Sequence, residues 1–428
     1  DNRSILMKLT ALILFILTYA LLLLLPKIRA YIALASASLF VILGIMPLNK
    51  LFLAIDWNVL LMIAGTMGIV SLFIESKMPS LLADIIIEKT PNIKWAIVSL
   101  SLFAGIISAF VDNVATVLMV APVAITISKK LKISPVQSII AIAISSNLQG
   151  AATLVGDTTS ILLGGQANMN FLDFFFYRGR IGMFFVVQLG ALVSTLVLLF
   201  IFRKQKQPIE ALKRTEVTDY FPTILLVGMI VLLITASFLP NMPKTINGII
   251  CVSLFVIGLI RSLLRNKNFK TFKMAVKEID YFTILLLAGL FVVVGAITEA
   301  GIVDDISKIF VKISGDNLFV IYSLIVWFSV LFSAFIDNIP YVATMLPVAA
   351  GISSLLGIEP YLLYFGLITG ATLGGNLTPI GASANITALG ILRKEGHEVK
   401  SLDFMKISVP FTLSAVTTGY ILIWLLWK

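Results

Sequence analysis

The sequence has almost no cysteine or histidine, with one of each in 428 residues. A single cysteine, Cys251, excludes a disulfide within the chain and a cysteine metal cage. The only histidine, His397, lies in a polar loop, where we expect it to be solvated. A soluble enzyme that depends on a catalytic His or Cys is therefore disfavoured, and we predict no catalytic residues and no cofactor.

Charged residues are also scarce. They make up 13% of the chain, against 59% hydrophobic residues, which is more apolar surface than one soluble core can bury. Residues 11–25, 223–239 and 284–297 carry no charge at all, and with their flanks they approach the roughly 20 residues that cross a bilayer. The composition predicts an all-α polytopic protein, a multi-pass protein of the plasma membrane.

The few charges have a basic excess, with a net charge of +10. They lie in short loops rather than on one stripe, so we expect lipid and not nucleic acid as the partner. The loops near 27–29, 77–94, 129–132, 203–214, 261–277 and 393–406 hold 23 of the 32 lysines and arginines. The positive-inside rule makes that side cytoplasmic, with both termini outside. Because the numbering starts at Asp1 without Met, a missing N-terminal segment could move that terminus.

Apolar runs divide the chain into two similar halves. We expect helices near 5–25, 31–47, 57–75, 136–164 and 181–202, and again near 221–239, 245–262, 281–299, 360–392 and 406–427. Before each broken helix (136–164 and 360–392) lies an apolar segment with an acidic centre, over 94–130 and 317–356. Its arms are short for a bilayer, which favours a re-entrant hairpin over two crossings. The first repeat is thus 1–202, the linker 203–219 and the second repeat 220–428, with interfacial helices near 81–90 and 303–314.

The two halves match at one constant offset in the numbering. Gly150, Thr153, Gly156 and Thr158 correspond to Gly375, Thr378, Gly381 and Ser383. Glycines at this density break a helix, and freed backbone groups in hydrocarbon need a cavity or protein partners. Since each half makes five net crossings, the second repeat is inverted. Inverted repeats with broken helices that meet near the midplane are typical of secondary transporters.

The hairpin tips and the breaks supply the candidate binding residues. An ionisable residue at membrane depth normally faces a partner or a cavity, although Asp112 and Asp337 could also simply cap the second arm of each hairpin. Asp157 has no acidic counterpart, since Ala382 takes its place, and no structural role is evident for it in an unwound segment. It suits a small hard cation or a transferable proton. The candidate substrate- and ion-binding residues are Asp112, Asn113, Thr116, Asn147, Gly150, Thr153, Gly156, Asp157, Thr158, Asp337, Asn338, Gly375, Asn376, Thr378, Gly381, Ser383 and Asn385.

No lysine or arginine lies in either tip or either break. An anionic solute would have to rely on helix N-termini and neutral donors. This disfavours a strongly charged solute such as citrate.

The motifs at 112–122, 337–347 and 373–385 resemble the ion transporter superfamily, most closely its arsenite-efflux (ArsB) and melanosomal P-protein branch, over almost the whole chain. The resemblance implies a scaffold domain and a mobile transport domain, an elevator motion and a homodimer. In the related divalent-anion/sodium symporters, Ser-Asn-Thr triplets at the tips bind sodium and the substrate carboxylate. Here only Asn113 and Asn338 carry over, because their neighbours are Asp and an aliphatic residue.

These observations predict a secondary active transporter that moves a small solute such as arsenite, coupled to Na⁺ or H⁺, with Asn113, Asp157 and Asn338 as candidate sodium ligands. One alternative within this fold is a sodium/proton antiporter, for which the carboxylates are the cargo site. Another is a sodium-coupled carboxylate transporter. A channel or a membrane-embedded enzyme is a different class, and no nucleophile or metal-ligand cluster in the sequence supports an enzyme.

Overall fold

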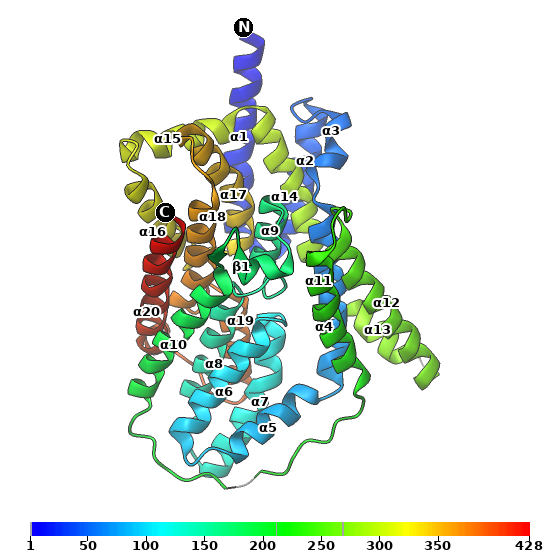
Figure 1. The fold of residues 1–428 in the computed structure, drawn as a ribbon, viewed down its shortest axis with the longest axis vertical. Coiled ribbons are helices and arrows are strands. Elements are labelled where there is room, and N and C mark those ends of the chain that lie inside the picture. Colours follow the sequence, from blue (N-terminus) through cyan, green and yellow to red (C-terminus); the bar gives the residue numbers. More distant parts are fainter. Residues whose placement is uncertain (1, 211, 268) are drawn as a thin grey trace.

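The computed structural model describes residues 2–210, 212–267 and 269–428 and consists almost entirely of helices (Figure 1). Nine helices of these residues are long and apolar enough to cross a membrane. A bent pair at 302–314 and 318–333, whose axes differ by 116°, would bring the number to ten. The chain therefore has the architecture of a multi-pass membrane protein.

The elements of the first half follow the order of the predicted ones. They are α1 (Asn2–Leu24), η1 (Pro26–Ile28), α2 (Arg29–Ile42), α3 (Leu48–Ala54), α4 (Trp57–Glu75), α5 (Met78–Glu88), α6 (Ile93–Ser108), α7 (Asn113–Leu131), α8 (Val136–Gln149), α9 (Thr158–Ala167), η2 (Phe171–Phe174), β1 (Phe176–Tyr177), β2 (Arg180–Ile181) and α10 (Met183–Ile201).

The second half has the same order, apart from the small β-hairpin. Its elements are α11 (Phe221–Phe238), α12 (Ile246–Asn266), α13 (Phe269–Lys277), α14 (Tyr281–Glu299), α15 (Ile302–Ser314), α16 (Leu318–Ser333), α17 (Asn338–Leu356), α18 (Tyr361–Ile368), the π-helix η3 (Thr369–Leu373), the 3₁₀ turn η4 (Gly375–Leu377), α19 (Ser383–Lys394) and α20 (Ser401–Trp427).

Two helical hairpins, α6–α7 and α16–α17, occupy the segments predicted to turn back on themselves; their second arms have 19 residues each and belong to the nine membrane-length helices. Each first arm has 16 residues, or about 24 Å of helix at 1.5 Å per residue, which is short of a hydrocarbon core of about 30 Å. Asn92 and Asn317 cap these arms by accepting from the backbone N–H of Trp95 and of Val320. An amide side chain at this position supplies a partner that the first turn lacks.

The helices pack in two groups, joined by α5 and α15. In one group α4 packs on α12, α2 on α14, and α1 and α11 on these pairs. In the other group α8 packs on α6 and α7, α10 packs on α20, and α16 and α17 pack on the α18–η3 segment. In Figure 1, α5 lies near the lower end of the molecule and α15 near its upper end. We call the first group the outer unit and the second group the hairpin unit.

One expectation about helix bounds needs correction, and two elements were not expected. The helix predicted over 31–47 ends at Ile42, because Gly44 takes a left-handed conformation (φ +73°) and turns the chain before the short α3. Nothing in the sequence indicated α13 or the β-hairpin, in which β1 pairs with β2.

The predicted linker, residues 203–219, contains no helix, and its Ala211 lies outside the described residues. It is nevertheless held against the interfacial helix α5. Arg214 makes two hydrogen bonds of 2.9 Å to the Glu88 carboxylate, and Thr215 donates its backbone N–H and its hydroxyl to Asp84. The strand-like start of the linker also accepts a backbone hydrogen bond from Ile93, the first residue of α6.

Candidate functional site

The first break separates α8 from α9 and places Asp157 at the start of α9. Asp157 is the N-cap residue there, with Oδ1 2.7 Å from the backbone N–H of Thr158. Its Oδ2 accepts a hydrogen bond of 3.3 Å from the Thr159 hydroxyl. The expectation that Asp157 has no structural role is therefore wrong, because α9 is short and its first N–H groups need an acceptor.

The hairpin tips also carry capping carboxylates. Asp112 accepts from the Ala115 N–H at 3.1 Å, and Asp337 accepts from the Ile339 N–H at 2.9 Å. Thr116 donates its hydroxyl to the Asp112 carbonyl and so turns back onto its own helix. The capping role that the sequence allowed is thus real at both tips, and each carboxylate has a second oxygen for another partner.

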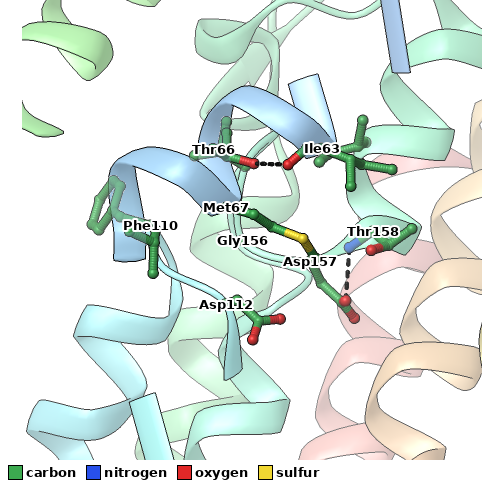
Figure 2. Close-up of a pocket in the computed structure, with 11 residues that line it drawn as sticks. Ile63, Thr66, Met67, Phe110, Asp112, Gly156, Asp157 and Thr158 are labelled. Carbon is green, nitrogen blue, oxygen red and sulfur yellow. Dashed lines mark hydrogen bonds between the residues drawn. The ribbon is translucent and has the colours of Figure 1, made fainter. Parts of the chain in front are cut away.

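A small cavity lies between α4, the first tip and the first break, and Figure 2 shows its walls. Its volume is about 20 Å³, enough for one water molecule or one ion. The lining residues are Ile63, Thr66, Met67, Val70, Phe110, Asp112, Val155, Gly156, Asp157, Thr158 and Ile161. Two carboxylates and two threonines thus meet in a space that apolar side chains of α4 also line.

Of the predicted residues, Asp112, Gly156, Asp157 and Thr158 line this cavity, and those of the second half do not. The second break is shorter than expected, because helical turns continue through Gly375–Leu377 and only 378–382 is irregular. Ala382 precedes α19 without a side-chain cap, and Ser383 is the first residue of that helix.

Buried amides connect the two halves next to the cavity. Asn113 donates to the Asn147 side chain (2.8 Å), and Asn147 donates to the Thr372 carbonyl (3.2 Å) and to the side chain of Asn376 (3.1 Å). Asn376 in turn donates to the Ile144 carbonyl at 2.8 Å. All three asparagines are buried, so these bonds hold the first tip, α8 and the second break together.

Each break is tied to its own hairpin by the same contacts, at corresponding positions of the two halves. Thr153 donates its hydroxyl to the Ala109 carbonyl, and Thr378 donates to the Ala334 carbonyl. Ser160 donates to the Gly150 carbonyl, and the equivalent Asn385 donates to the Gly375 carbonyl.

The glycines of the breaks are needed for close approach. A Cβ on Gly156 would lie 2.6 Å from the Gly150 carbonyl oxygen, and a Cβ on Gly381 would collide with the Gly375 carbonyl oxygen. This contact explains why both breaks keep a second glycine at the same distance from the first one.

One functional candidate escaped the sequence analysis. Arg29, which was grouped with the loop cations near 27–29, places Nη2 2.5 Å from Oδ2 of Asp337 at the second tip. The sequence shows no cation in the tips, but the fold brings one to them from the turn between α1 and α2. An arginine at the start of an apolar helix was the available signal.

A bundle of membrane-length helices, with paired hairpins and interrupted helices around buried polar groups, is typical of multi-pass membrane transporters. The chain belongs to the citrate transporter (CitMHS) family, whose sequence model matches residues 12–366. The predicted resemblance to the ion transporter superfamily and the predicted multi-pass location in the cell membrane agree with this membership.

Several relatives are similar to this chain over nearly its whole length. An uncharacterized transporter of Mycobacterium tuberculosis is 30% identical over 411 residues, which is 93% of each chain. A 46 kDa membrane protein of Mycobacterium leprae is 29% identical over 430 residues and covers 98% of this chain and 99% of its own. The human P protein is 26% identical over 465 residues, 90% of this chain and 56% of its own. The P-protein relationship that the motifs indicated is thus confirmed.

Two solved structures have a similar fold. The YdaH transporter of Alcanivorax borkumensis superposes with a TM-score of 0.61 at 14% identity, over 99% of this chain and 98% of its own. MtrF of Neisseria gonorrhoeae, described as an antimetabolite efflux pump, gives 0.55 at 15% identity, over 94% and 85%. At these identities the likeness concerns the fold alone.

Proposed function

We propose that the chain is a secondary active transporter that moves a small solute by an elevator motion, coupled to a cation that binds at Asp112 and Asp157. The observation that carries the proposal is the cavity of about 20 Å³ that these two carboxylates share with Thr66 and Thr158. Two acids facing one small space favour a cation or a proton between them.

In this mechanism two inverted repeats each contribute helices to a fixed part and to a moving part. The contacts that recur at corresponding positions of the two halves support a duplication, and the opposite placement of α5 and α15 in Figure 1 supports the inversion. The repeats would be 1–202 and 220–428, joined by the linker. We assign the outer unit to the scaffold and the hairpin unit to the mobile transport domain. Hydrogen bonds among the side chains of Asn113, Asn147 and Asn376 hold the hairpin unit together.

The boundary between these units passes through the cavity. The scaffold contributes Ile63, Thr66, Met67 and Val70 from α4, and the transport domain contributes the tip and the break. A sliding motion at this boundary would open the cavity without breaking the hydrogen bonds that hold the tip to the break.

The chemistry of the cavity favours Na⁺ or H⁺ as the coupling ion. The described residues contain no group of three or more His, Cys, Asp or Glu side chains that could hold a metal ion, whereas Na⁺ is satisfied by carboxylate, hydroxyl and carbonyl oxygens. Of the three candidate sodium ligands, Asp157 lines the cavity. Neither Asn113 nor Asn338 lines the cavity, so we place the coupling ion between Asp112 and Asp157.

A sodium/proton antiporter is the second candidate, and the size of the cavity favours it. A volume of about 20 Å³ accepts an ion or a water but not a solute of several heavy atoms. In the antiporter the two carboxylates would bind the cargo itself.

Flux in proteoliposomes separates the two functions. A transporter carries arsenite or citrate faster when a sodium or proton gradient is imposed and exchanges little cation without the solute. Full cation exchange with no solute present would replace the first proposal by the second.

We further propose that the chain forms a homodimer and that Lys129–Lys132 and Arg203–Arg214 face the cytoplasm.

A further inference from the structure

The turn between α1 and α2 brings a positive charge to the second hairpin tip. Arg29 is the first residue of α2, and its Nη2 lies 2.5 Å from Asp337 Oδ2. The Arg29 side chain is 19% exposed and that of Asp337 is 20% exposed. The two residues therefore form a largely buried ion pair between the outer unit and the hairpin unit.

The two partners depend on this pair to different degrees. Asp337 keeps its capping hydrogen bond to the Ile339 N–H with its other oxygen, at 2.9 Å. The Nε of Arg29 is buried, and among the described residues no hydrogen-bond partner faces it. If the two separate, the carboxylate retains a donor while the guanidinium loses its counter-ion and still has an unused N–H group.

The motion described under the proposed function, on which this inference rests, would separate them. Arg29 belongs to a helix that packs on α14, and Asp337 belongs to the hairpin that moves. A buried cation that loses its only partner is strongly destabilised. An anionic group that replaces Asp337 beside Arg29 when the second tip moves away would offset this cost.

We propose that Arg29 is a specificity-determining residue of the solute site, and that its guanidinium passes from Asp337 to a carboxylate or oxyanion group of the solute. A guanidinium is a planar fork that fits both groups, and its idle Nε–H offers the second bond of a bidentate contact. The expectation that an anionic solute must rely on neutral donors alone then no longer holds.

The contact equivalent to Arg29–Asp337, at the first hairpin tip, has no arginine. Helix α12 packs on α4 in the way that α2 packs on α14. At the matching contacts, Cys251 of α12 lies against Gly65, and Ala33 of α2 lies against Gly289. The residue four positions earlier is Asn247 in α12 and Arg29 in α2. The tip without an arginine is the one beside the Asp112–Asp157 cavity, so the structure assigns the coupling ion to the first tip and the anionic solute to the second.

Equilibrium binding tests the proposal without requiring transport. Thermal unfolding of the purified protein is followed with citrate and, separately, with arsenate, which distinguishes a carboxylate from an inorganic oxyanion. The variants are Asp337→Asn and the neutral double variant Arg29→Gln/Asp337→Asn. The control is Lys27→Gln, which removes an exposed positive charge two residues away.

We expect at least one anion to stabilise the wild type and the control. Asp337→Asn removes the competitor for Arg29, so it should unfold at a lower temperature without anion and regain more stability than the control when the anion is added. The double variant should bind the anion about tenfold more weakly or worse, because it lacks the charge-assisted hydrogen bonds. A third variant, Arg29→Lys, keeps the charge but not the planar guanidinium. Its affinity for the anion should lie between that of the control and that of the double variant.

Two results would overturn the proposal. One is a double variant that binds the anion as tightly as the control. The other is an Asp337→Asn protein that neither anion protects more than the control. The readout is equilibrium anion binding rather than gradient-driven flux, so a failure of the coupling mechanism and a failure of the Arg29 assignment give different results.

Discussion

Replacement of Asp157 by Asn isolates its charge from its role in the fold. In the structure the carboxylate caps α9 through the Thr158 N–H at 2.7 Å, and Asn caps about as well as Asp. Asp157→Asn should therefore change stability by only a few tenths of a kcal/mol. Asp157→Ala loses the cap as well, at a cost of about 1 kcal/mol. The pair of variants separates a structural loss from a functional one.

The expected functional effect is large. A tenfold gradient of a coupling cation stores about 1.4 kcal/mol per ion, so the wild type can hold up to about a tenfold solute gradient for each coupled ion. Without the carboxylate, the ratio of internal to external solute should fall to about 1 in both variants.

The assay measures the steady-state solute ratio in proteoliposomes at matched protein density, together with the unfolding temperature. Asp316→Asn, at an exposed turn between α15 and α16, is the control and should behave like the wild type. A full solute ratio in Asp157→Asn would refute the assignment. A loss confined to Asp157→Ala would show that the cap matters and the charge does not.

Three further predictions follow from the breaks and the loops. Gly156→Ala should destabilise the protein or prevent its accumulation, because the added methyl group meets a carbonyl oxygen, whereas Gly228→Ala, with nothing within 4 Å, should be neutral in the same thermal assay. Asn376→Leu should lower the unfolding temperature, because a buried N–H of Asn147 loses its acceptor, at a cost of about 1–3 kcal/mol; an unchanged temperature would mean that the amide bridge does not stabilise the site. In a background without the native cysteine, a cysteine at Lys206 should be labelled from the cytoplasmic side only and one at Arg178 from outside only, and the reverse pattern in intact cells would invert the topology.

The sequence was sufficient to place elements whose signal is local. Helix α14 spans Tyr281–Glu299, the range that its uncharged run predicted, and the interruption of α8 follows from the glycines beginning at Gly150. Both depend on short-range physics, namely the length of an apolar run and the inability of glycine-rich backbone to stay helical in hydrocarbon.

Long-range contacts could not be predicted in this way. Arg29 next to Pro26 and Lys27 has the composition of a loop, and nothing nearby shows that Asp337, in the other half of the chain, comes to meet it. The cap that Asp157 forms depends on the position at which α9 resumes, which the composition of a break does not specify. Asn376 was predicted as a candidate ligand, and composition gave no indication that its side chain also holds the two halves together.

The difference between the two breaks affects how any vesicle experiment must be read. Asp157 begins α9 with a charge and a cap, while Ala382 begins α19 with neither. If the repeats face opposite sides of the bilayer, a molecule inserted upside down offers the acidic break to the wrong compartment. Vesicles with randomly oriented protein are then a mixture of two carriers with different driving forces, and only preparations of a single sidedness report the properties of one.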